Sequence, residues 1–292
     1  MPPLTLTLRP TMSALPPPAN GGVYTLDELL APHADLLASL ALPYAELEYH
    51  SVPYGAGNAL EPDGMAAHTS KLGGVPFTPA GHPWPRTGRD GDGTPYHFVA
   101  QVNFAEAPPL PGFPSAGILQ VFSDFTGQDW DDSNGLVRYL GPALAQAPQV
   151  LSPPMDEEHR EEYEETDPVS SPARISYRAG VSAGGASDAG FLAALKAVGL
   201  DTEEWWGDER FKAAQSELYD RYFAGGPRLG GHAHFIGDDP RGDWSHEDVH
   251  VLQIDSRGHV NFGDAGHVHV LIPPEALAAG NWGEAYYHWA DH

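Results

Sequence analysis

The chain carries the same short pattern twice, and this repeat constrains its fold more than any other feature. Lys-Leu-Gly-Gly at 71–74 returns as Arg-Leu-Gly-Gly at 228–231, and in each copy two strand-like segments follow in the same order. These segments cover 97–104 and 117–122 after the first copy, and 250–256 and 266–271 after the second. Similar segments that recur in one order predict a duplicated β-rich unit.

Helical patterns lie apart from these strands along the chain. Thr25 and Glu28 have the form of a capping box, and Pro32 is expected to interrupt the apolar-periodic stretch that follows them. Helical periodicity returns at 188–198 and 207–223. Because helices and strands are segregated, the sequence predicts an α+β fold, internally duplicated, with mainly antiparallel β-sheet units and peripheral helices.

The expected domain organisation follows from the repeat. Residues 1–22 are rich in proline and predict a flexible tail. Residues 23–292 are expected to form a single domain made of two related halves, at about 65–140 and 225–292. An acidic, helical connector would join the halves, and its run at 156–167 is mostly charged residues.

Composition restricts the class of partner. The 40 Asp and Glu residues outnumber the 15 Lys and Arg residues and give a net charge of −25, which disfavours nucleic acid and anionic membranes as ligands. The same charge would attract a basic protein, although it is also an ordinary solubility device. The chain has no cysteine, which excludes disulfides and thiol chemistry. It shows no signal-like or membrane-spanning apolar run, so a cytoplasmic location is expected.

Two polar pairs occupy matching positions in the two copies. The alternation of a strand places Gln101 and Asn103 on one face, and it places Gln253 and Asp255 on the matching face of the second copy. These pairs either form a hydrogen-bonded network that satisfies backbone groups or line a cleft for a small polar ligand. With two charged residues nearby in the second copy, the candidate ligand-binding residues are Gln101, Asn103, Arg241, Gln253, Asp255 and Asp264.

Histidines concentrate near the C-terminus, where nine of the fifteen fall within 232–292. They include two His-x-His pairs, so the candidate metal ligands are His232, His234, His267 and His269. On a strand both imidazoles of such a pair point to one side, and a divalent metal can use them if Asp239 or Asp264 converges on them. The alternative is partly exposed strand histidines without a metal, since the first copy has Ile118 and Gln120 in place of the second pair. No other cofactor is expected.

The order of several motifs resembles the YwqG-like proteins, a bacterial domain of unknown function. The segment 229–241 is similar to the family's Gly-Gly-Tyr-Pro-x-Phe-Thr-Gln-x-Asp-Pro-Arg, and 252–256 is similar to its Leu-Gln-Ile-Asp-Ser strand. Residues 262–266 resemble its Trp-Gly-Asp-Ala-Gly turn, and 287–289 its terminal Tyr-x-Trp. The resemblance covers about 65–292. It implies a duplicated α+β fold and a cytosolic bacterial protein whose relatives occur in toxin-immunity and stress-related gene neighbourhoods, and it transfers no catalytic residues.

Two functional hypotheses follow. The first is a non-catalytic module that binds a basic protein or a small polar ligand, because the chain is acidic and lacks the Gly-x-Ser-x-Gly and phosphate-binding glycine motifs of common enzymes. The second is a metal-dependent hydrolase that uses the C-terminal histidine and aspartate cluster to activate water. The second requires three ligands to converge on one point in the fold.

Overall fold

A computed structural model describes residues 15–19, 21–52, 63–87, 93–124, 135–150, 165–241 and 247–292. These residues belong to two compact units. The helical unit comprises Met1–Leu42, Val181–Gly225 and His232–Glu247, and the sheet unit comprises Pro43–Gly180, Gly226–Gly231 and Asp248–His292. Most of the predicted connector at 156–167 and most of the predicted tail at 1–22 lie outside the described residues.

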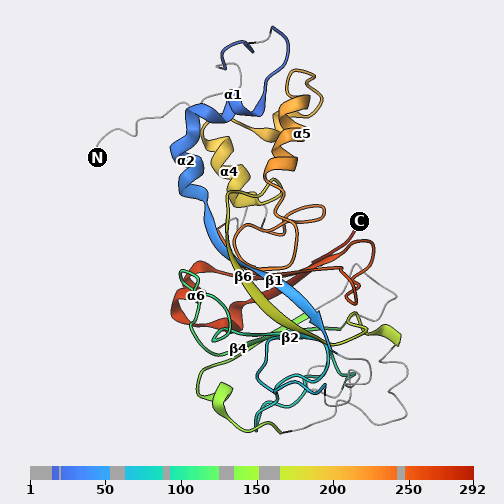
Figure 1. Cartoon of the computed structure of the whole chain (residues 1–292). Helices are drawn as coiled ribbons and strands as arrows, with labels where there is room; N and C mark the ends of the chain where they lie inside the picture. The colour runs from blue at the N-terminus through green and yellow to red at the C-terminus, as the bar shows by residue number, and fades with distance from the viewer. Residues whose placement is uncertain are drawn as a thin grey trace. The chain divides into compact units, whose positions relative to one another are not determined.

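A ten-stranded sheet forms the larger part of the described structure (Figure 1). Its strands are β1 (Leu42–Ser51), β2 (Lys71–Leu72), β3 (His97–Asn103), β4 (Ile118–Ser123), β5 (Gly135–Leu140), β6 (Ala173–Ser182), β7 (Arg228–Gly230), β8 (Val249–Asp255), β9 (His267–Ile272) and β10 (Tyr286–Ala290). Their order across the sheet is β10-β9-β8-β7-β1-β6-β2-β3-β4-β5. The strands that follow each Gly-Gly pair therefore form opposite halves of one sheet, with β1 and β6 between them.

The two ends of this sheet approach each other, so the sheet is barrel-like and nearly closed. Tyr287 of β10 packs its ring against Gly135 of β5, and its hydroxyl lies 3.2 Å from the hydroxyl of Ser123. The pairs β2–β3, β3–β4, β4–β5, β7–β8, β8–β9 and β9–β10 are all antiparallel. The fold is thus mainly antiparallel β-sheet with a few helices, as the strand patterns predict.

One apolar cluster fills the sheet unit and draws on both halves. Val102 and Leu119 of the first half share it with Ile254 and Val270 of the second. All four side chains are fully buried. The alternation of residues along these strands explains the arrangement, because one face of each strand packs into this core. The other face of β4 carries Gln120 between the buried apolar residues Ile118 and Phe122.

The helical unit contains α1 (Leu26–Leu30), α2 (Ala34–Leu40), α4 (Ala189–Ala197) and α5 (Lys212–Arg221), which Figure 1 shows gathered together. The capping box of Thr25 and Glu28 is present, and a short 3-10 turn at Ala31–His33 separates α1 from α2, as the predicted break at Pro32 requires. Phe191, Trp205 and Leu218 lie in the core of this unit.

The helix predicted over 207–223 is shorter in the structure. A 3-10 turn covers Thr202–Trp205, and α5 begins only at Lys212. Gly207 has a φ of +80°, a left-handed conformation that a right-handed helix cannot include, so it separates the two segments. No described helix is long and apolar enough to cross a membrane.

Candidate functional site

Each half of the sheet carries a row of four polar side chains, one from each of four neighbouring strands. In the first half the directly paired residues are Lys71, Gln101, Gln120 and Arg138. In the second half they are Arg228, Gln253, His269 and His288. Because directly paired residues of antiparallel strands project from the same face, each row forms a continuous polar line across its half. Two of the predicted binding residues, Gln101 and Gln253, occupy the same position in the two rows.

The side-chain amide of Gln101 has all of its hydrogen-bonding positions satisfied within the protein. Its Oε1 accepts hydrogen bonds from the backbone N–H of Phe77 (2.8 Å) and from Nε2 of Gln120 (2.9 Å). Its Nε2 donates to the carbonyls of Ala67 and Thr69, both at 2.9 Å. These four bonds match the two acceptor and two donor positions of a glutamine amide. Gln101 therefore fixes a loop to the sheet, which agrees with the network interpretation of this polar pair.

Asn103 binds the same loop. Its Nδ2 donates to the carbonyl of His68 (3.0 Å), and its Oδ1 accepts from the backbone N–H of Ala105 (3.0 Å). The Nζ of Lys71 lies 2.9 Å from Asp63, and both side chains are buried. Burial lowers the pKa of Lys71, while the charge of Asp63 opposes that shift. Contacts from this row and from Asn103 thus anchor residues 63–69 and Phe77 to the sheet.

Gln253 and Asp255 contact each other and hold the chain that enters β7. Nε2 of Gln253 donates to Oδ1 of Asp255 (2.8 Å), and the backbone N–H of Gly226 donates to Oδ2 of the same carboxylate (2.7 Å). Nε2 of His267 lies 3.8 Å from Oδ2 of Asp255. Asp264, by contrast, is exposed in the connection between β8 and β9. Gln253 and Asp255 are therefore hydrogen-bonded to each other, as a polar pair on one strand face can be, whereas Asp264 lies apart from them on the surface.

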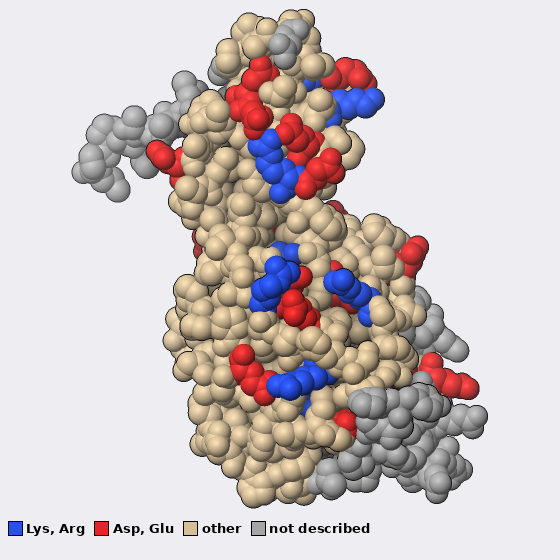
Figure 2. Space-filling view, in the orientation of Figure 1, with Lys and Arg blue, Asp and Glu red and all other residues tan. Residues whose placement is uncertain are grey.

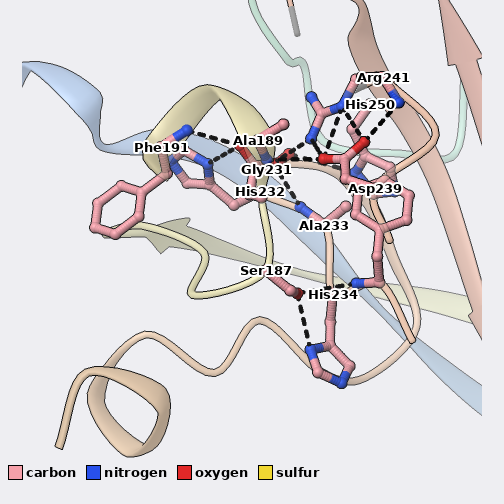
Figure 3. Close-up of polar contacts among 12 residues, drawn as sticks. Ser187, Ala189, Phe191, Gly231, His232, Ala233, His234, Asp239, Arg241 and His250 are labelled. Atoms are coloured by element: carbon pink, nitrogen blue, oxygen red, sulfur yellow. Dashed lines mark hydrogen bonds and ion pairs between the residues drawn. The ribbon is translucent and has the colours of Figure 1, made fainter. Parts of the chain in front are cut away.

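Arg241 belongs to a buried ion cluster in the helical unit (Figure 3). Its Nη2 lies 2.8 Å from Asp188 and 2.7 Å from Asp239, and its Nε donates to Oδ1 of Asp239 at 3.0 Å. Asp188 also caps α4 by accepting from the backbone N–H of Phe191 at 3.0 Å. Burial would raise the pKa of Asp188, but neighbouring His232, whose Nδ1 lies 3.5 Å away, and the charge of Arg241 lower it well below its ordinary value.

The two His-x-His pairs have different surroundings. Nε2 of His232 donates to the carbonyl of Leu40 (2.8 Å), and Nδ1 of His234 lies 3.2 Å from the hydroxyl of Ser187. Figure 3 shows the ring of His234 turned toward Ser187 and away from Arg241. These two histidines are in the helical unit, whereas the second pair is in the sheet unit.

The second pair lies in a row of rings on β8, β9 and β10. His269 is fully buried, and its ring centroid lies 6.0 Å from that of His267, 5.6 Å from that of His250 and 6.1 Å from that of His288. Among the described residues, no group of three His, Asp or Glu side chains is placed to hold a metal ion. The described part of the chain therefore offers no assembled metal centre.

A cleft of about 600 Å³ opens in the helical unit and carries an excess of carboxylates. Its lining residues are Ala186, Ser187, Ala189, Leu192, Ala193, Lys196, Asp201, Thr202, Glu203, Tyr219, Gly237, Asp238 and Asp239. We call it the acidic cleft, because four of these side chains are carboxylates and one is a cation. Its volume falls in the usual range of ligand sites, about 300–1,000 Å³.

The charged side chains that line the acidic cleft differ in their partners and in their exposure. Nζ of Lys196 lies 2.9 Å from Asp201 and 3.3 Å from Glu203, and the hydrogen bond to Asp201 is the main cause of its raised pKa. Asp239 is fixed from behind by Arg241 and also accepts from the backbone N–H of Ala189 (2.8 Å). Asp238 is exposed. Figure 2 shows positive and negative side chains mixed in small groups on the visible face of the protein, so no large patch of one sign is present there.

Of the residues that line the acidic cleft, the sequence analysis named only Asp239, as a possible ligand in a histidine-metal site. It missed Lys196, Asp201 and Tyr219. The acidic run at 201–204 is visible in the sequence, but its approach to Tyr219 and to 237–239 depends on the packing of α4 and α5.

The fold and its buried polar rows define a mainly antiparallel, barrel-like β protein with an attached set of helices. The chain belongs to the DUF1963 family, described as a domain of unknown function, which matches residues 70–290. The matched region begins just before β2 and ends at the last residue of β10, so it includes both polar rows. No curated protein matches the chain.

Proposed function

We propose that this protein is a non-catalytic binding module that docks a basic segment of a partner protein in the acidic cleft. The observation that carries the proposal is the composition of the cleft, which is lined by the carboxylates of Asp201, Glu203, Asp238 and Asp239 and by one cation, Lys196. In the free protein the exposed Lys196 forms ion pairs with Asp201 and Glu203. A lysine or arginine side chain of the partner would compete with Lys196 for these two carboxylates.

The apolar wall of the cleft suits the stem of such a side chain. Leu192 and Ala193 of α4 and Tyr219 of α5 line the cleft together with the carboxylates, and Tyr219 is 43% exposed. Long cationic side chains cover apolar surface with their methylenes, and an aromatic face attracts the charge itself. The net charge of −25 would speed the encounter with a basic partner, with an effect that weakens as salt increases.

The described residues do not favour a metal-dependent hydrolase as a second function. That hypothesis needs three converging ligands drawn from His232, His234, His267, His269 and nearby aspartates, and the described residues include no such group. A metal-content measurement on protein purified without chelator would test it directly.

We also propose that the two halves of the sheet arose by duplication. Three features support the proposal: the symmetrical strand order on either side of β1 and β6, the matching polar rows, and the irregular register just before Ala100 in β3 and Leu252 in β8. Membership in the YwqG-like group and a cytoplasmic location rest on the motif resemblance and stay predictions.

A peptide titration tests the proposed function. A fluorescein-labelled nonapeptide rich in lysine and arginine is titrated with the full chain at low salt, and a glutamate-rich peptide of the same length serves as the negative probe. The test variant is Asp201→Asn/Glu203→Gln/Asp238→Asn. The matched control, Asp35→Asn/Glu204→Gln/Glu209→Gln, removes the same charge from exposed positions of the same unit that do not line the cleft.

The proposal predicts that the cleft variant binds the basic peptide at least roughly tenfold more weakly, since it loses several charge-assisted contacts. The control variant should lose much less, because its carboxylates act only through the screened long-range field. Equal weakening in both variants would show that net charge alone attracts the peptide, and it would contradict the proposed docking site. Failure of the wild-type chain to bind the peptide would contradict it as well.

A further inference from the structure

A second cleft, of about 450 Å³, lies in the sheet unit and has a different chemical character. Its lining residues are Glu46, Leu47, Glu48, Tyr49, Ser51, Leu72, Ser171, Ala173, Arg257, Gly258, His259 and Val260. We call it the sheet cleft. It lies beside β1, at the junction of the two halves of the sheet, and the turn between β8 and β9 contributes Arg257–Val260 to its wall.

The side of the cleft formed by β1 is negatively charged. Glu46 and Glu48 project from β1, and both bind the guanidinium of Arg178 on β6, Glu48 at 3.4 Å from its Nε. Two carboxylates therefore share one cation. Glu48 is 47% exposed on its side chain, so it can accept a further positively charged group.

Another part of the lining is a fixed turn that carries a cation. Backbone hydrogen bonds link Arg257 and Val260 in both directions, at 3.0 and 3.1 Å, and Gly258 has a φ of +63°. The backbone N–H of Ser170 donates to the carbonyl of His259 (2.9 Å), which ties the turn to the sheet unit. The side chain of Arg257 is exposed and forms no ion pair with any described residue. Its guanidinium is available to an anion.

Tyr49 also lines the sheet cleft, and its hydroxyl group is not hydrogen-bonded within the described part of the protein. Its hydroxyl oxygen is buried and has no hydrogen-bond partner among the described residues, while its ring packs against the core of the sheet unit. Buried hydroxyls normally have a partner, because an unpaired one costs free energy. Burial, assisted by the charge of Asp255 and opposed by that of Arg257, raises the pKa of Tyr49 well above its ordinary value, so the hydroxyl stays protonated and can donate.

We infer that the sheet cleft binds a small zwitterion, either a free amino acid or the end of a short peptide. The ligand carboxylate accepts hydrogen bonds from the guanidinium of Arg257 and the hydroxyl of Tyr49, and the ligand ammonium faces Glu48. The buried side chains of Leu47, Leu72 and Val260 also line the cleft and make part of its lining apolar, which favours an aliphatic ligand side chain. Nothing in this inference depends on the acidic cleft, whose lining residues all belong to the other unit.

Calorimetric titration of the full chain with leucine and three analogues tests the inference. N-acetylleucine lacks the ammonium group, leucinamide lacks the carboxylate, and glycyl-leucine presents both charges on a longer backbone. Leucine or glycyl-leucine should bind, and each analogue that lacks one charge should bind at least roughly tenfold more weakly than leucine. Tighter binding of glycyl-leucine would identify a peptide end as the ligand class, and tighter binding of leucine would identify the free amino acid.

Substitutions at three residues of the sheet cleft test whether the ligand binds there. Arg257→Gln and Glu48→Gln should each weaken the zwitterion at least roughly tenfold, whereas Arg210→Gln in the helical unit should leave its affinity unchanged. Tyr49→Phe should weaken it roughly 3- to 10-fold and yet leave the melting temperature of the free protein equal or higher, because it removes an unpaired buried hydroxyl. The inference is overturned if neither leucine nor glycyl-leucine binds the wild-type chain, or if their binding is insensitive to Arg257→Gln and Tyr49→Phe.

Discussion

At the scale of single residues, the buried charges of the helical unit depend on one another. Asp188 accepts from the guanidinium of Arg241, from the backbone N–H of Phe191 in the first turn of α4, and from the backbone N–H of Ala233 at 3.3 Å. Only 4% of either charged side chain in the Asp188–Arg241 pair is exposed. When one partner of such a pair loses its charge, the other remains buried with less compensation, so the cost exceeds that of losing an exposed ion pair.

Asp188→Asn is therefore expected to lower the free energy of unfolding of the helical unit by about 3–5 kcal/mol. Urea denaturation followed by tryptophan fluorescence, to which buried Trp205 of this unit contributes, measures this change. Asp208→Asn is the control, because it removes an equally short but exposed pair with Arg210, and it should change stability little. Similar effects of the two substitutions would contradict the assigned role of the buried cluster.

The same carboxylate predicts a pH dependence. The pKa of Asp188 is lowered in the folded protein, so its contribution to stability is present above the unfolded value of about 4 and is lost as the pH falls below it. The stability of the wild-type helical unit should decline on acidification below about pH 4. Asp188→Asn should show a shallower decline, since it has no carboxylate to protonate. The free energy of unfolding of both proteins is measured by denaturation at several pH values from 3 to 7. An equal dependence of this free energy on pH in the two proteins would contradict the assigned role of Asp188.

At the scale of elements, the Gly-Gly turn that follows β2 allows the buried ion pair of the first polar row to form. Gly74 has a φ of +71°, and a Cβ added there would lie 2.6 Å from Oδ2 of Asp63 and 3.1 Å from Pro172. Only glycine accommodates both the backbone conformation and the close approach. The repeated Gly-Gly pair of the sequence is thus explained by the geometry of the turn at this position.

Gly74→Ala should consequently destabilise the sheet unit by more than Gly112→Ala. Gly112 has a φ of +81° with open space around it, so alanine there incurs only the left-handed backbone cost of about 1–2 kcal/mol. At Gly74 the added methyl must also displace Asp63, which adds roughly 1–3 kcal/mol. Thermal unfolding of the two variants measures the difference, and equal melting temperatures would show that the turn tolerates a side chain.

The sequence predicts local features of these elements better than long-range contacts. The capping box of Thr25 and Glu28 and the break at Pro32 depend on neighbours within one turn, and both are confirmed. The pairing of Arg241 with Asp188 joins residues 53 positions apart, and no local pattern specifies it. Likewise, strand alternation predicts the face on which Gln101 lies. It does not predict the hydrogen-bond partners of the Gln101 amide, because Ala67 and Phe77 belong to segments outside the strand.

At the scale of the whole molecule, the charge excess and the acidic cleft point to the same class of partner. The net charge of −25 acts over a distance of about one Debye length, roughly 8–10 Å at moderate salt, and it carries no information about position. The acidic cleft would determine where the partner binds, since carboxylates and apolar side chains such as that of Tyr219 line the same cleft. A basic partner should therefore associate faster at low salt but occupy one site at any salt concentration at which it binds.

Hydrogen exchange with and without the basic nonapeptide tests this central claim most directly, because it locates the bound peptide on the intact chain. The account predicts protection in the segments that line the acidic cleft, at 186–203, around Tyr219 and at 237–239, and no comparable protection in the sheet unit. Saturating peptide that leaves these segments unprotected, or that protects the sheet unit instead, would contradict the proposed docking site.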